Sequence, residues 1–293
     1  MLCKGLRSLI TGADAVWAEA GERFFQGGMN ACWVWLAENG HLPLLRLYGK
    51  DVWETTLEKG LRLAATRGHA DVVRFIREPL MEASMQLIID VSRLGHLNVL
   101  RELLTFPRRG TRLRDAVNVA SRAGHTSVVE ALLEDVRYDG YHCKIALVEF
   151  VILGEDLGLQ RLSMIALREN QHLALDYALS TAVLKGKASA VEILLGNGAR
   201  FRPSRNFRDI RSAVMSGQPA IMRRLLDAGV PPAPHFNTIC AMLRRGEFVL
   251  DVAIQFLDLL LTDSSPAGWR ALALREAEDL GLSALADHIQ ARW

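Results

Sequence analysis

The sequence predicts an all-α protein built from repeated pairs of helices. Half of its 293 residues are hydrophobic but only 7% are aromatic, so alanine, leucine and valine supply most of the apolar material. Such side chains favour helices, whereas β-rich folds use more aromatic and β-branched residues. A second observation, a Gly-His dipeptide that recurs between apolar helical segments, predicts that the helices come in repeated units.

The Gly-His dipeptide recurs at a nearly constant interval. Its four copies are separated by 28, 27 and 29 residues, and they begin at Gly40, Gly68, Gly95 and Gly124. A fixed period of this size is typical of stacked helical units. Weaker copies of the same pattern follow around Gly154, Gly186, Gly217, Gly246 and Gly281.

Each part of the unit has a physical reason. We expect the glycine to end the first helix, because the residue after a helix often adopts the left-handed conformation. Small residues such as Ala64 and Ser92 precede the glycine and let the first helix approach its neighbours. Apolar pairs such as Val72/Val73 and Val128/Val129 begin an apolar stripe on the second helix. One helix pair cannot bury this stripe alone, so neighbouring pairs must stack.

The strings "LAATRGHADVVRFI", "VASRAGHTSVVEALL" and "VEILLGNGARF" resemble the ankyrin repeat. The resemblance is clear over residues 31–230 and fainter beyond. It implies an all-α, ankyrin-type helical repeat solenoid of about eight or nine helix pairs. The usual T-P-L-H opening is missing and several turns between units are short, which shifts the expected binding surface from the hairpin tips to the concave helical face.

The domain organisation follows from the extent of the pattern. Residues 1–30 fit no unit and are expected to form N-terminal capping helices. Residues 31–230 are expected to form the ankyrin-type repeats. Residues 231–293 are expected to form degenerate C-terminal repeats and a cap.

The sequence predicts neither a metal site nor a cofactor. His41, His69, His96 and His125 belong to units about 10 Å apart by analogy with helix packing, whereas zinc ligands meet within about 2 Å of one ion. We expect these histidines to hydrogen-bond nearby loop backbone. No nucleophile, phosphate-loop, zincin or dinucleotide motif is present. Cys143 follows His142, but a buried, inert thiol is expected there.

A basic residue recurs just before the glycine in most of the units. The two positions before the glycine face the concave side in the ankyrin family, and a basic residue occupies one of them in five of seven units. The predicted partner-binding residues are Arg67, Arg93, Arg122, Lys185 and Arg245. A positive ladder would suit an acidic segment of a partner protein. Alternatively, these are solvated helix ends, where the helix dipole favours cations.

These observations predict a non-enzymatic scaffold that binds a protein partner through the concave face. The irregular units resemble those of bacterial effectors and large viruses, so a narrower version is a secreted effector or host-interaction factor. One alternative is an enzyme or toxin subunit with a site in the irregular stretch 135–170. Another is nucleic-acid binding along a basic groove, which the net charge of +2 does not favour. No membrane span or small-molecule substrate is expected. The expected location is the cytoplasm, or the cytoplasm of a host cell if the protein is a secreted effector.

Overall fold

The computed structural model describes residues 28–77, 84–105, 113–136, 139–200, 218–245, 250–261 and 265–292. These residues form 17 helices and no strand, which confirms the predicted all-α class. The chain divides into two compact units, Met1–Arg137 (unit 1) and Tyr138–Trp293 (unit 2). Most of the predicted N-terminal cap, residues 1–27, lies outside the described residues.

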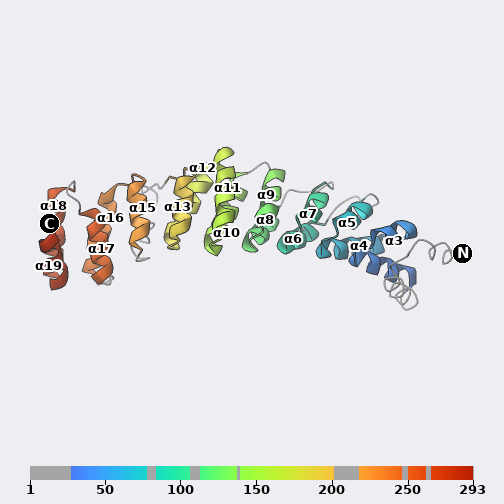
Figure 1. The fold of residues 1–293 in the computed structure, drawn as a ribbon, viewed down its shortest axis with the longest axis horizontal. Coiled ribbons are helices and arrows are strands. Elements are labelled where there is room, and N and C mark those ends of the chain that lie inside the picture. Colours follow the sequence, from blue (N-terminus) through green and yellow to red (C-terminus); the bar gives the residue numbers. More distant parts are fainter. Residues whose placement is uncertain are drawn as a thin grey trace. The chain divides into compact units, whose positions relative to one another are not determined.

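Unit 1 consists of short helices that pack in two rows (Figure 1). The first row contains α4, α6 and α8, and the second row contains α5, α7 and α9, because each helix contacts the next member of its row as well as its partner in the pair. The helix of residues 28–38 precedes them. The others are α3 (Leu42–Tyr48), α4 (Glu54–Arg67), α5 (Ala70–Arg77), α6 (Met85–Leu94), α7 (Leu97–Leu104), α8 (Arg114–Arg122) and α9 (Thr126–Asp135).

Unit 2 repeats this contact pattern. In its first row α10 contacts α12 and α16 contacts α18, and in its second row α11, α13, α15, α17 and α19 contact one another in order. The helices are α10 (Gly140–Leu153), α11 (Asp156–Arg168), α12 (His172–Leu184), α13 (Ala188–Gly196), α15 (Pro219–Asp227), α16 (Pro232–Arg244), α17 (Leu250–Leu260), α18 (Ala267–Asp279) and α19 (Ser283–Arg292). None of the described helices combines the length and apolarity that a bilayer crossing requires.

The glycines end the first-row helices as predicted. Gly68 has a φ of +86°, and the backbone N–H of His69 donates to the carbonyl oxygen of Ala64 at 2.9 Å. This bond, which spans five residues, is the helix-ending motif that a left-handed residue permits. The weaker copies at Gly154 and Gly186 also have positive φ angles, whereas Gly217 and Gly246 lie outside the described residues.

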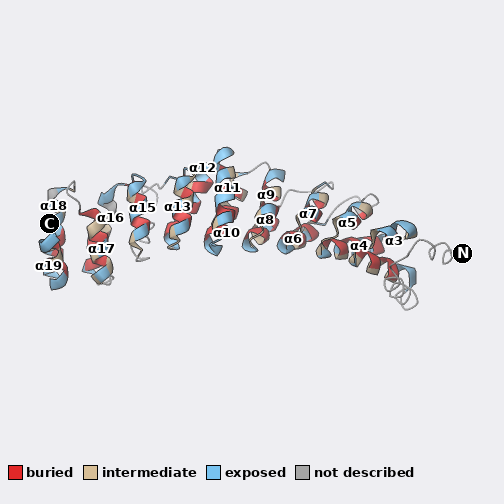
Figure 2. Cartoon of the chain, viewed as in Figure 1, coloured by how far each residue is buried: buried red, intermediate tan, exposed pale blue. Residues whose placement is uncertain are grey.

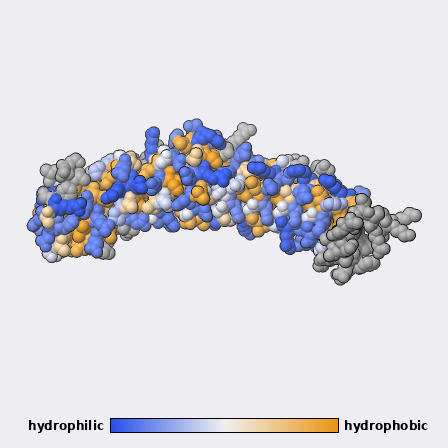
Figure 3. All heavy atoms as spheres, viewed as in Figure 1, coloured by the Kyte–Doolittle hydropathy of each residue, from blue (hydrophilic) through white to orange (hydrophobic). Residues whose placement is uncertain are grey.

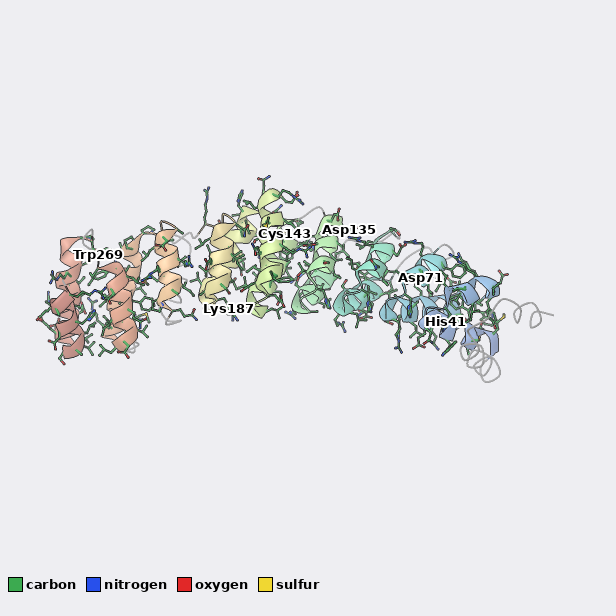
Figure 4. All side chains as sticks on the ribbon, in the orientation of Figure 1. His41, Asp71, Asp135, Cys143, Lys187 and Trp269 are labelled. Atoms are coloured by element: carbon green, nitrogen blue, oxygen red, sulfur yellow. The ribbon has the colours of Figure 1, made fainter. Side chains whose placement is uncertain are left out.

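The core lies on the faces where the helices pack, as the buried residues in Figure 2 show. The small residues before the glycines and the apolar pairs of the second helices are buried there, including Ala64, Ser92, Val72, Val73, Val128 and Val129. One close approach depends on Gly60, because a Cβ there would lie 2.3 Å from the indole of Trp33. Toward the C-terminus, the ring of Trp269, labelled on α18 in Figure 4, stacks on Phe236 with centroids 4.6 Å apart.

Candidate functional site

The histidines of the Gly-His dipeptides connect one repeat to the preceding one. His96 Nε2 donates to the carbonyl oxygen of Thr66 at 3.0 Å, and His125 Nε2 donates to that of Arg93 at 3.0 Å. Each ring also covers the glycine of the preceding repeat, so that a Cβ on Gly95 would lie 2.7 Å from the His125 ring. The predicted structural role is confirmed for these two histidines, although the acceptor lies in the last helical turn of the preceding repeat and not in a loop.

The 135–170 stretch contains two regular helices in its described part. Asp139 begins α10 by accepting hydrogen bonds from the backbone N–H groups of Tyr141 and His142, and His142 Nδ1 also donates to Asp139 at 2.8 Å. Cys143 is buried, and this burial, assisted by the charges of Asp139 and Glu169, raises the pKa of its thiol to about 12. The thiol therefore stays protonated near neutral pH, which is unfavourable for a nucleophile.

The described residues contain no cluster of three or more histidine, cysteine, aspartate or glutamate side chains that could hold a metal ion.

The predicted cations in unit 1 lie at exposed helix ends. Arg67 pairs with Glu38 at 2.9 Å, and Arg93 approaches Asp90 at 3.4 Å. Arg122 is the exposed last residue of α8. Exposed pairs of this kind are worth about 0–1 kcal/mol, but they place carboxylates of the chain beside two of the predicted binding residues.

A cleft of about 550 Å³ between α4 and α6 carries both signs of charge. Glu58 and Asp90 line it together with Lys59 and Arg62. The first row of unit 1 therefore presents a mixed polar surface and not a uniformly positive one.

The five predicted cations do not share one helical stripe. Arg67, Lys185 and Arg245 stand one residue before the glycine, whereas Arg93 and Arg122 stand two residues before it. One residue corresponds to a rotation of about 100° around a helix. Lys185 and Arg245, which are exposed at the ends of α12 and α16, belong to unit 2, and the three arginines belong to unit 1.

At the position two residues before the glycine, α10 and α12 differ from the helices of unit 1. It holds Thr66, Arg93 and Arg122 in unit 1, but Ile152 and Leu184 in α10 and α12 of unit 2. Both apolar side chains are exposed. Both residues belong to a larger apolar surface that contains none of the five predicted cations.

The larger surface, which we call the apolar face, runs along α10 and α12. Its members repeat every third or fourth residue on each helix, and the two helices are in register at an offset of 32 residues. The apolar face comprises Tyr141, Ile145, Val148 and Ile152 on α10, and Leu173, Tyr177, Ser180 and Leu184 on α12.

Most of the apolar face is open to solvent. Leu173 is 69% exposed and Tyr177 is 53% exposed, while Tyr141, Ile152 and Leu184 are each about 45% exposed. The space-filling view shows hydrophobic residues gathered over the α10–α12 part of unit 2 (Figure 3). The same stripe of α4 holds Thr55, Lys59, Arg62 and Thr66, so stacking of the helices does not require it to be apolar.

A single lysine lies between the two tyrosines of the apolar face. The Lys144 ammonium is 4.6 Å from the ring centroid of Tyr177 and 5.4 Å from that of Tyr141. Such distances are within the range of cation–π attraction. Lys144 is half-buried, and it forms no ion pair with any residue that the structure describes.

A sequence signal for this surface does exist. The α10 segment "GYHCKIALVEFVIL" and the α12 segment "HLALDYALSTAVL" are apolar around most of their circumference. A helix in a two-row array needs apolar residues only on its packing sides. The excess of apolar residues outside those sides marks the exposed face.

Comparison with protein-family models and with curated proteins finds no match to this sequence.

Proposed function

We propose that this protein is an ankyrin-type repeat solenoid that recognises a partner protein through the first-row surface of α10 and α12. The observation that carries the proposal is the exposed apolar face, which contains two tyrosines and five aliphatic residues, with one lysine between the two tyrosine rings. Contiguous exposed apolar surface on a soluble protein often marks an interaction site, and tyrosine is enriched at the centres of interfaces.

The repeat geometry supports the assignment of the fold. Each Gly-His dipeptide ends one helix and begins the next, and helices two apart in the chain contact each other in both rows. The first row corresponds to the concave side of an ankyrin array. The surface proposed for binding is therefore on the side expected from the ankyrin resemblance. Its side chains, however, are apolar and aromatic, and not the row of basic residues that the sequence predicts.

The two alternative functions, an enzyme site in the 135–170 stretch and nucleic-acid binding along a basic groove, gain no support from the described residues. Cys143 is buried with a protonated thiol, and the cleft between α4 and α6 carries acidic as well as basic groups. The secreted effector and its host partner remain a prediction.

The test is a photo-crosslinking experiment in extract of the source cell or its host. A photoreactive amino acid replaces Ser180, which lies within the apolar face and is half-buried. The disrupting variant carries Tyr177→Asp and Leu184→Asp. The matched control carries Leu157→Asp and Met164→Asp, which are 77% and 57% exposed on α11 in the second row.

We expect a crosslinked protein that the disrupting variant loses and the control variant retains. A third variant, Arg93→Glu with Arg122→Glu, tests the basic positions of unit 1 in the same way. If all variants give the same crosslinks as the unsubstituted chain, the apolar face is not the recognition surface and the proposal is wrong.

A further inference from the structure

The apolar face has a size that restricts what can occupy it. Tyr141 and Ile152 are eleven residues apart, which is about 16 Å along a helix, and two packed helices lie about 10 Å apart. The face therefore offers on the order of 200 Å², whereas a standard protein interface buries about 800 Å² on each partner. A second copy of this chain held only by this face would be weakly bound. A short segment with a few apolar side chains fits it better.

The charge of Lys144 specifies a further property of that segment. An occupant of the apolar face would remove water from the half-buried ammonium, which has no carboxylate partner among the described residues. Burying an unpaired charge is costly unless the partner supplies the opposite charge. Asp176, which precedes Tyr177 in the sequence, does not supply that charge: it forms no ion pair with Lys144, and it accepts a hydrogen bond from the backbone N–H of Arg200 at 2.7 Å.

The tyrosine rings hold the ammonium in a defined place. With Tyr177 from α12 and Tyr141 from α10 both within cation–π range, Lys144 is restrained where the apolar stripes of the two helices meet. A restrained cation loses less conformational entropy when it pairs than a freely moving lysine does. A carboxylate placed among apolar side chains would therefore complete the site.

We propose that the apolar face binds a short peptide segment of a partner protein in which an aspartate or glutamate, flanked by apolar residues, pairs with Lys144. This inference rests on the proposed function and specifies its partner. It moves the expected acidic recognition from the predicted ladder residues to a lysine that the sequence pattern did not single out.

The test uses a phage-displayed library of random peptides selected on the immobilised full-length chain. The unsubstituted chain is compared with Lys144→Glu, with Lys185→Glu as the matched control, and with the double variant Tyr177→Asp and Leu184→Asp. Lys185 is exposed at the end of α12 but lies outside the apolar face. Circular dichroism and thermal unfolding verify that each variant is folded before selection.

We expect the unsubstituted chain and Lys185→Glu to enrich peptides with an acidic residue between apolar ones. Lys144→Glu should enrich peptides with a basic residue at that place, and it should weaken the binding of the original peptides at least tenfold. The Tyr177/Leu184 variant should enrich neither class. Exchange of the preferred charge is a result that loss of folding cannot produce.

Two other results separate the inference from the proposed function. The first is the selection of peptides that need Tyr177 and Leu184 but show no acidic preference or bind Lys144→Glu equally well. This result would overturn the inference, but it would still support the apolar face as the recognition surface. Absence of any peptide that depends on the apolar face would contradict both. Sedimentation velocity tests whether a second copy of the chain covers the apolar face instead. Dimerisation that Tyr177→Asp abolishes would show that it does, and this result would also overturn the inference.

Discussion

His125 donates a hydrogen bond from its Nε2 atom to the carbonyl oxygen of Arg93, which lies in the last turn of α6. Carbonyl groups in the last turn of a helix have no partner within that helix. The histidine of one repeat therefore completes the hydrogen bonding of the repeat before it, and His96 does the same for Thr66. The Gly-His dipeptide has two separate roles, because its glycine ends one helix while its histidine closes the end of another.

Replacing His125 with alanine should destabilise unit 1. The substitution removes the hydrogen bond to the exposed Arg93 carbonyl and uncovers Gly95, and a hydrogen bond of this kind contributes about 0.5–1.5 kcal/mol to stability. Urea unfolding measures the loss, with His172→Ala as the control, because His172 is exposed at the start of α12. Equal midpoints for the two variants would show that the interaction contributes nothing.

Replacing Gly95 with alanine should destabilise the chain for two reasons. Its φ of +81° costs a side chain about 1–2 kcal/mol, and the new Cβ would lie 2.7 Å from the His125 ring. Gly196→Ala is the control, because its Cβ would meet open space within α13. In the double variant Gly95→Ala/His125→Ala the two losses should not add, because the clash disappears with the ring. Strict additivity in urea unfolding would mean that the ring does not contact Gly95.

Acid should remove a stabilising contribution from the C-terminal part of unit 2. Arg244 Nε donates to Glu276 at 2.7 Å, and this hydrogen bond, with the charge of the guanidinium, lowers the pKa of the Glu276 carboxyl. Because the pKa is lower in the folded state, the contribution is present above the unfolded pKa of about 4.3 and is lost as the pH falls through the folded value.

The measurement is thermal unfolding between about pH 3 and pH 7. Glu276→Gln should lower the midpoint near neutral pH, and the difference from the unsubstituted chain should shrink in acid. Glu278→Gln, on an exposed residue of the same helix, serves as the control. A difference that is constant with pH would exclude the ionised pair as its source.

Buried thiols should resist alkylation in the native protein. Burial raises the pKa of Cys143 to about 12 and that of Cys240 to about 11, and it also raises the pKa of Cys32. At pH 8, about one Cys143 thiol in ten thousand would be ionised. Iodoacetamide followed by peptide mass spectrometry should modify these three cysteines only in denaturant. Rapid modification of Cys143 in the folded protein would instead support the alternative of an enzyme site in the 135–170 stretch.

The sequence predicted the repeated units best where the glycine is present. Only glycine reaches the left-handed conformation without steric cost, so Gly154 and Gly186 identify their helix ends even without a following histidine. The end of α11 was less visible, because Asn170 takes the left-handed position there with a φ of 58°. In addition, α10 and α11 span 14 and 13 residues, whereas α8 and α9 span 9 and 10, so the longer interval made this stretch look irregular.

The candidate site was less predictable than the fold. A cation near a helix end stands out in a sequence, but its orientation depends on whether it lies one or two residues before the glycine, as Arg67 and Arg93 do. From the sequence alone, Ile145 and Val148 cannot be distinguished from core residues, because the sides on which α10 packs are not known. The contact of Lys144 with Tyr177 joins residues from two helices, and no local pattern records it.

The histidine contacts also determine how the two units should open under native conditions. In unit 1, the ring of His69 covers Gly40, that of His96 covers Gly68, and that of His125 covers Gly95. Loosening one helix end there disturbs the adjacent repeat, so amide protons should exchange in blocks that cross repeat boundaries. At Gly281, which follows the first-row helix α18 in unit 2, a Cβ would by contrast meet nothing within 4 Å. The end of α18 can therefore fray by itself, and its amides should exchange individually.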